Sequence, residues 1–144
     1  MIFQKSSAFT MIEILIVLAI IGFLFAFLGP TLYRRIAQSD VALTKLKMGK
    51  VKDALVEYKN NVGHYPTKRE GGLRALIEKP QGVENWNGPY LDSEDDLLDK
   101  WGNELELNIP PVKSKKFRYL EIISYGADGQ EGGIGENAEI IVGG

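Results

Sequence analysis

A stretch of twenty residues near the start of the chain, Phe9–Leu28, carries a single charged side chain, Glu13. An α-helix rises about 1.5 Å per residue, so residues 9–30 cover roughly 30 Å, the thickness of a bilayer's hydrocarbon core. We therefore expect residues 9–30 to form a transmembrane helix. A carboxylate inside a bilayer costs about 2.5–3.5 kcal/mol on insertion scales, so we expect Glu13 to have a functional role.

The composition narrows the classes of function. The 144 residues carry a formal net charge of −2, no cysteine and one histidine, His64. A weakly acidic chain offers no electrostatic reason to bind nucleic acid. The lack of cysteine excludes disulfides and the usual zinc and iron–sulfur ligand sets, whereas oxygen-liganded ions such as calcium are compatible. The sequence shows no catalytic nucleophile–base pattern and no phosphate-binding loop, so we expect no enzymatic activity.

A short polar stretch, residues 1–8 (MIFQKSSA), precedes the apolar run. In a secretory signal peptide the small residue of the cleavage site follows the apolar core. Here the small residue, Ala8, comes first, so cleavage after Ala8 would leave the whole apolar helix on the mature chain. The sequence AFTMIEILIVLAIIG at this point resembles the processing site and N-terminal helix of type IV pilin-like proteins.

The resemblance implies a processing reaction at the N-terminus. Residues 1–8 would be a prepilin leader peptide, cut between Ala8 and Phe9 by a prepilin peptidase. The same enzyme would N-methylate the new amine of Phe9. Glu13 would then be the fifth residue of the mature chain, where the family carries glutamate.

Three interpretations of Glu13 are open. The Phe9 amine and Glu13 lie four residues apart, on one helix face, so they can neutralise each other within one chain. The resemblance implies instead that, in a filament, Glu13 of one subunit meets the Phe9 amine of a neighbour and sets the axial register. The third interpretation is that Glu13 is tolerated in the first turn, where the helix dipole favours an acid.

Basic residues follow the apolar span. Arg34 and Arg35 come first, and four lysines lie between residues 45 and 52. Lysine and arginine counts alone predict that the residues after the span lie in the cytoplasm. The resemblance implies the opposite orientation, which we expect: a single pass through the bacterial inner membrane, with the N-terminus cytoplasmic and residues 31–144 forming a soluble periplasmic domain.

A helical pattern continues beyond Pro30. Apolar residues recur at alternating steps of four and three, which predicts a stripe packed against the rest of the soluble domain. A coiled-coil partner is the alternative, but only about three heptads are present. We expect one bent helix from Phe9 to Asn61, roughly 80 Å long, with Gly63 as its left-handed C-cap. The resemblance implies that this helix melts locally at Gly22 and Pro30 in filaments. The stripe comprises Ala37, Val41, Thr44, Met48, Val51, Leu55, Tyr58 and Val62.

The C-terminal part contains short segments between loops rich in glycine, asparagine and proline. Thr67 and Glu70 have capping-box spacing, which predicts a short helix ending before Pro80. The segments ELELNI, KFRYLEIIS and NAEIIV alternate like strands. The predicted fold class is α+β, of the type IV pilin kind: a long N-terminal helix packed on a small antiparallel sheet, with a short helix in the connecting loop.

Further motifs narrow the resemblance. The segments EYKNNVGHYPT, GGLRALIEKP, GPYL, DKWGN and SYGADGQEGG resemble those of major pseudopilins of the bacterial type II secretion system. One departure is Lys100, where that family usually has proline before Trp101 and Gly102. The resemblance implies a structural subunit of a periplasmic fibre, the pseudopilus, which helps drive folded proteins through the outer membrane.

The same resemblance implies the partners. They are further copies of the chain in a helical homopolymer, the prepilin peptidase and N-methyltransferase, minor pseudopilins and the inner-membrane secretion platform. One alternative is a type IV or competence pilin, although many of these carry a C-terminal disulfide. Another is a membrane-anchored binding module that never assembles and needs neither cleavage at Ala8 nor an amine partner for Glu13.

The loop YGADGQEGGIGENAEI holds the candidate ligand site. Calcium binds several carboxylate and carbonyl oxygens, and glycines let carbonyls turn inward. The spacing is not that of an EF-hand, and acidic, Gly-rich loops are commonly only solvated. The resemblance implies a structural calcium bound by Asp128 and the carbonyl of Tyr125. Glu139 stands where the family usually has aspartate, so Glu136 or Asn137 are alternative ligands.

Other polar and aromatic residues predict structural roles. We expect the lysines between Lys45 and Lys52 to form a solvated helix face that could meet acids of a neighbour in a fibre. The acidic run 92–100 predicts a solvated loop or helix start. Trp86 and Trp101 are flanked by glycine and asparagine, so we expect them to anchor loops.

Overall fold

The structure of the chain is a computed structural model that describes residues 9–144. The predicted leader, with Ala8, lies outside the described residues. The chain divides into two compact units, Met1–Ile36 and Ala37–Gly144. The long helix α1 (Met11–Val62) contributes residues to both units.

Within the first unit, α1 presents its apolar side chains outward. Every residue from 9 to 28 is exposed, and Phe25 is 75% exposed. Among residues 9–144, α1 is the one helix that is long and apolar enough to cross a membrane. Gly22 and Pro30 both lie inside the helix, so the melting expected there in filaments stays a prediction.

Within the second unit, α1 buries the predicted stripe. Its central members are buried and its ends, at Ala37, Val41 and Val62, are half-buried. The helix ends at Val62, and Gly63 follows with a φ of 98°, which confirms the predicted C-cap. The buried members of the stripe are Thr44, Met48, Val51, Leu55 and Tyr58.

Three strands form the predicted antiparallel sheet, in the order β1-β2-β3. They are β1 (Glu106–Asn108), β2 (Glu121–Ser124) and β3 (Ile140–Gly143). Strand β2 is shorter than the alternating segment that predicted it. The backbone N–H groups of residues 118–120 converge on the Gly144 carbonyl at 2.7–3.4 Å instead of forming a ladder.

The segment that connects α1 to β1 contains 3₁₀ turns rather than the single short helix expected. Thr67 and Glu70 do form a capping box, at the start of η1 (Lys68–Glu70). Gly71 then adopts a left-handed conformation, with a φ of 94°, before η2 (Gly72–Leu76) begins. A left-handed residue interrupts the hydrogen-bond ladder of an α-helix, so two short 3₁₀ segments result.

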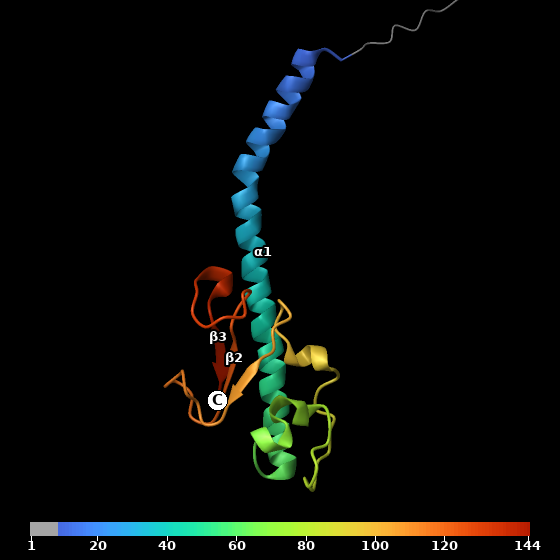
Figure 1. Cartoon of the computed structure of the whole chain (residues 1–144), viewed down its shortest axis with the longest axis vertical. Helices are drawn as coiled ribbons and strands as arrows, with labels where there is room; N and C mark the ends of the chain where they lie inside the picture. Colours follow the sequence, from blue (N-terminus) through green and yellow to red (C-terminus); the bar gives the residue numbers. More distant parts are fainter. Residues whose placement is uncertain (1–8) are drawn as a thin grey trace, which may run out of the picture. The chain divides into compact units, whose positions relative to one another are not determined.

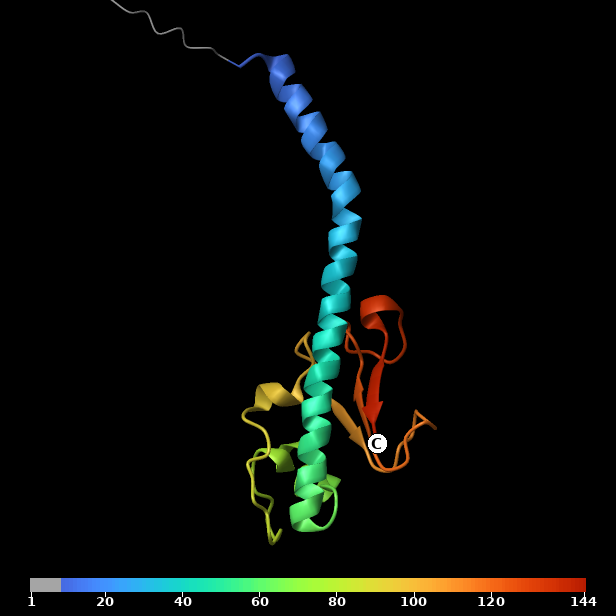
Figure 2. The ribbon, with the colours of Figure 1, turned by 180° about the vertical axis from the view of Figure 1, so that it is seen from behind.

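The core of the second unit lies around the C-terminal part of α1. The sheet covers one side of this helix, and the η2 segment with η3 (Glu94–Leu97) covers the other (Figure 1; Figure 2). Trp86 donates its indole N–H to the Ala75 carbonyl at 2.8 Å and packs edge-on against Tyr90 at 5.6 Å. Trp101 packs half-buried against the same core. Both tryptophans therefore anchor loops, as predicted.

Part of the lysine face of α1 is paired rather than only solvated. The Lys47 ammonium donates to the Asp95 carbonyl at 2.8 Å and to its carboxylate at 3.0 Å. The Lys50 ammonium lies 2.8 Å from Asp92 and 3.1 Å from Asp96. The acidic run does begin a helical segment, η3, and its acids meet lysines of α1 in the same chain. Solvent screens exposed pairs of this kind, so each adds little to stability.

A buried carboxylate, Asp99, ties the turn after η3 to the sheet. Its oxygens accept the N–H groups of Trp101 and Asn103 at 3.0 and 2.9 Å and the Ser124 hydroxyl at 2.7 Å. In the same turn the Lys100 N–H donates to the Thr44 hydroxyl on α1 at 3.2 Å. A proline at position 100 would lack this N–H, so the departure noted at Lys100 adds a contact to α1.

A second buried carboxylate, Glu121, holds the segment between β1 and β2. It accepts the backbone N–H groups of Val112, Lys113 and Ser114 at 2.8, 2.8 and 2.9 Å and the Asn108 amide at 3.3 Å. Burial alone would raise the pKa of Glu121. The donated hydrogen bonds outweigh it and hold the pKa below the ordinary value of 4.5.

Replacing Glu121 with glutamine should destabilise this unit. The amide keeps one acceptor oxygen but loses the charge, and bonds to charged groups contribute about 1.5–3 kcal/mol. A carboxyl with a lowered pKa contributes stability at neutral pH that is lost as the pH falls below about 4.5. Denaturant unfolding of the full chain in detergent should therefore show a deficit for Glu121→Gln at neutral pH that narrows in acid. The exposed Glu104→Gln is the control, and an equal effect of both variants would contradict this role.

Candidate functional site

The first turn of α1 gives Glu13 a partner within its own chain. The Glu13 carboxylate accepts the N–H of Thr10 at 3.4 Å, and the Thr10 hydroxyl accepts the N–H of Glu13 at 3.3 Å. This reciprocal pair is a capping box, which satisfies two N–H groups that a helix start otherwise leaves unpaired. We did not predict it, although the spacing of Thr10 and Glu13 matches the motif.

The capping box holds the acid of Glu13 at the start of the apolar helix. Phe9 lies just before this turn, with its ring exposed. In the uncleaved chain the nitrogen of Phe9 is an amide, so the predicted ion pair with Glu13 requires cleavage after Ala8. The predicted roles of Ala8 and Phe9 in processing and of Glu13 in assembly therefore stay predictions.

The loop between β2 and β3 closes on a lysine from outside it. The Lys113 ammonium donates to Glu131 at 2.6 Å and to Glu139 at 2.7 Å, and it lies 4.8 Å from the centre of the Tyr125 ring. Glu139 also accepts the N–H of Gly132 at 3.1 Å. The hydrogen bonds to Glu131 and then Glu139 raise the pKa of Lys113, and the bond from Lys113 lowers the pKa of Glu139.

Two glycines, Gly126 and Gly133, allow the loop backbone to cross closely over the backbone of residues 136 and 137. Gly126 has a φ of 73°, and a Cβ there would lie 2.5 Å from the Glu136 carbonyl oxygen. Gly133, with a φ of 94°, would meet the Asn137 carbonyl. The crossing is fixed by the Ala127 N–H, which donates to the Glu136 carbonyl at 2.9 Å. Side chains at either glycine would open the loop.

Several of the predicted calcium ligands have contacts within the chain in this arrangement. Glu139 and the ring of Tyr125 face Lys113, whereas the Tyr125 hydroxyl donates to Glu106 at 2.7 Å. Asp128 is exposed and accepts the N–H of Gln130 at 3.1 Å.

Glu136 contributes its carbonyl to the crossing, and Asn137 is exposed. Within residues 9–144, no group of three or more acids or histidines is placed to hold a metal ion. Calcium therefore stays a prediction from the resemblance. Sequence reasoning missed Lys113 and Glu131; the acid of Glu131 inside the loop was the available signal.

Two protein-family models match this chain, one over the soluble part and one over the N-terminal part. Residues 31–143 match the family described as type II secretion system (T2SS), protein G. Residues 3–29 match the prokaryotic N-terminal methylation motif. The two matches together cover the apolar helix and the second unit up to residue 143.

Individual relatives agree with this assignment. The type II secretion system core protein G of Pseudomonas aeruginosa is 36% identical over 95% of this chain and 94% of its own length. The Vibrio cholerae protein of the same name is 33% identical over 95% and 91%. The crystal structure of the major pseudopilin from the type 2 secretion system of enterohaemorrhagic Escherichia coli matches with a TM-score of 0.56 and 27% identity. That match covers 72% of this chain and 86% of that one. This chain therefore belongs to the protein G family of the type II secretion system and is a pseudopilin, a structural subunit of the pseudopilus.

Proposed function

We propose that the chain is made as a precursor and matured at its N-terminus before it assembles. Cleavage falls between Ala8 and Phe9, and the amine of Phe9 is N-methylated. The N-terminal methylation motif over residues 3–29 supports this proposal. So does the capping box, which starts the helix only two residues after the proposed cut.

The apolar half of α1 anchors the precursor in the inner membrane. Its apolar side chains are exposed, as those of a helix in contact with lipid are. This exposure is the main observation that supports a membrane anchor. We place the N-terminus in the cytoplasm, where the leader meets the prepilin peptidase, and the second unit in the periplasm. The basic residues Arg34 and Arg35 favour the reverse orientation, but a leader on the far side would not meet the peptidase.

Assembly moves this apolar helix from lipid to the centre of a fibre of identical subunits. In the fibre, neighbouring copies cover the side chains that the monomer exposes. Glu13 then pairs with the Phe9 amine of a neighbour, which compensates its charge in a low-dielectric interior. The prepilin peptidase, minor pseudopilins and inner-membrane platform act with the subunit, which contributes contacts and no covalent chemistry.

The alternatives raised by the sequence have less support. A type IV or competence pilin would not be expected to match the protein G family over residues 31–143. A binding module that never assembles would have no use for the methylation motif. The fibre subunit accounts for both matches.

Processing can be tested by co-expressing the chain with a prepilin peptidase. We expect mass spectrometry to find a chain shortened by residues 1–8, with N-methylphenylalanine at Phe9. Because the small residue before the cut must fit the peptidase, Ala8→Leu should block shortening, and Ala19→Leu inside the helix should not. A product that keeps its leader in the presence of active peptidase would contradict the proposal.

To test the assembly role of Glu13, membrane insertion and incorporation into fibres must be measured separately. Glu13→Ala removes a charge from the apolar segment, so membrane insertion should be kept while incorporation into fibres is lost. The exposed Glu57→Ala on the same helix is the control and should assemble. Both are scored by membrane fractionation and by crosslinking or microscopy of fibres. Normal assembly of Glu13→Ala would refute the role.

A further inference from the structure

The C-terminal loop, residues 125–139, is strongly acidic. It contains four carboxylates, at Asp128, Glu131, Glu136 and Glu139, and no lysine, arginine or histidine. Five of its residues are glycines, which lose more conformational freedom on folding than any other residue. Like charges and glycine both oppose a single ordered conformation, so a cation that brings the acids together would stabilise the loop.

The structure supplies this cation from the segment between β1 and β2. Lys113 reaches two acids of the loop, Glu131 and Glu139, which are eight residues apart, and its ammonium also lies over the Tyr125 ring. The Lys113 side chain is only 21% exposed, and that of Glu139 only 20%. An ion pair shielded to this extent is screened less by solvent and salt than a fully exposed one.

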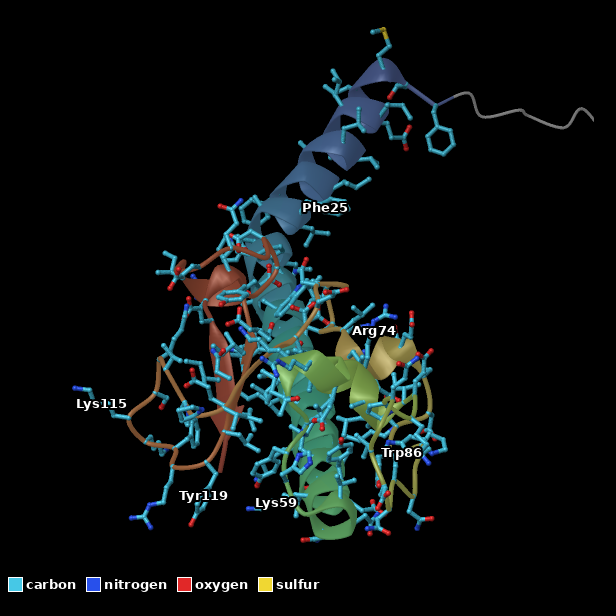
Figure 3. All side chains as sticks on the ribbon, turned by 60° about the horizontal axis from the view of Figure 1, so that its bottom comes forward. Phe25, Lys59, Arg74, Trp86, Lys115 and Tyr119 are labelled. Carbon is cyan, nitrogen blue, oxygen red and sulfur yellow. The ribbon has the colours of Figure 1, made fainter. Side chains whose placement is uncertain are left out.

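The position of Lys113 is set independently of the loop. Its own backbone N–H donates to the buried Glu121 at 2.8 Å, as do those of its neighbours Val112 and Ser114. The ammonium therefore extends from a fixed backbone, which lowers the entropy lost when the pair forms. Lys115, two residues on, shows the contrast, because its side chain points outward from the same segment (Figure 3).

We propose that the Lys113 ammonium is the cation that closes the C-terminal loop, in place of a bound divalent metal ion. Calcium needs six to eight oxygen ligands, and it would have to take Glu139 from the ammonium. Two positive charges on one carboxylate repel each other, so the ammonium and the ion compete for Glu139. The loop then folds without calcium, and its stability depends on Lys113.

The proposal is tested on the full chain in detergent by thermal unfolding in calcium chloride and in EGTA. We expect the same Tm in both solutions and no heat of binding when calcium is titrated calorimetrically. Lys113→Met should lower the Tm by several degrees more than the matched control Lys115→Met. A higher Tm of the wild-type chain in calcium, or equal Tm values of the two variants, would overturn the proposal.

A milder pair of variants covers the case in which Lys113→Met does not fold. Glu131→Gln removes one charge that faces Lys113, whereas Asp128→Asn removes the acid that the resemblance nominates first for calcium. A lysine-closed loop predicts that Glu131→Gln lowers the Tm more than Asp128→Asn. A calcium-closed loop predicts the reverse order, measured in calcium, and that order would refute the role of Lys113.

Discussion

The carboxylate of Glu121 fixes the C-terminal half of the folded unit. It is fully buried in β2, and three successive backbone N–H groups converge on it. Such a carboxylate can stay charged inside a protein only when its hydrogen-bond acceptors are filled. These bonds hold the backbone of residues 112–114 in place, and with it the starting point of the Lys113 side chain. The loop that closes on Lys113 depends in turn on the same carboxylate.

Three further acids also accept hydrogen bonds or pair with a cation. Glu13 caps the first turn of an apolar helix, Asp99 joins a turn to β2, and Glu139 meets an ammonium. The chain has no cysteine, so no disulfide can fasten its irregular segments. Hydrogen-bonded carboxylates do this in the second unit. In a fibre subunit this matters because neighbouring copies must meet a surface of fixed shape.

Local patterns predicted the elements well. The stripe on α1, the C-cap at Gly63 and the three strands follow from spacing, because periodicity reports which face of an element is buried. Local chemistry also explains the errors. Gly71 splits the expected helix into 3₁₀ turns, and the threonine at Thr10 offered a capping box that we overlooked.

Contacts between distant segments were not predictable in the same way. Lys47 and Asp95 are 48 residues apart, and Lys113 and Glu131 are 18 apart. Their meeting depends on how η3 and the loop pack, which no short motif encodes. The resemblance nominated the acids of the C-terminal loop for calcium but could not show that a lysine reaches Glu139. The sequence thus pointed to this loop as a candidate site, while the ammonium that we propose as its cation was identified only from the fold.

The most direct measurement is nitrogen-15 NMR of lysine ammonium groups in the full chain in detergent, with the Lys113 signal assigned by its loss in Lys113→Met. An ammonium held by two carboxylates exchanges its protons slowly and gives a resolved signal, whereas a solvated ammonium does not. Closure of the loop by Lys113 predicts a resolved Lys113 signal that is the same in calcium chloride and in EGTA. Disappearance of that signal when calcium is added would show that the ion displaces the lysine and would contradict this assignment.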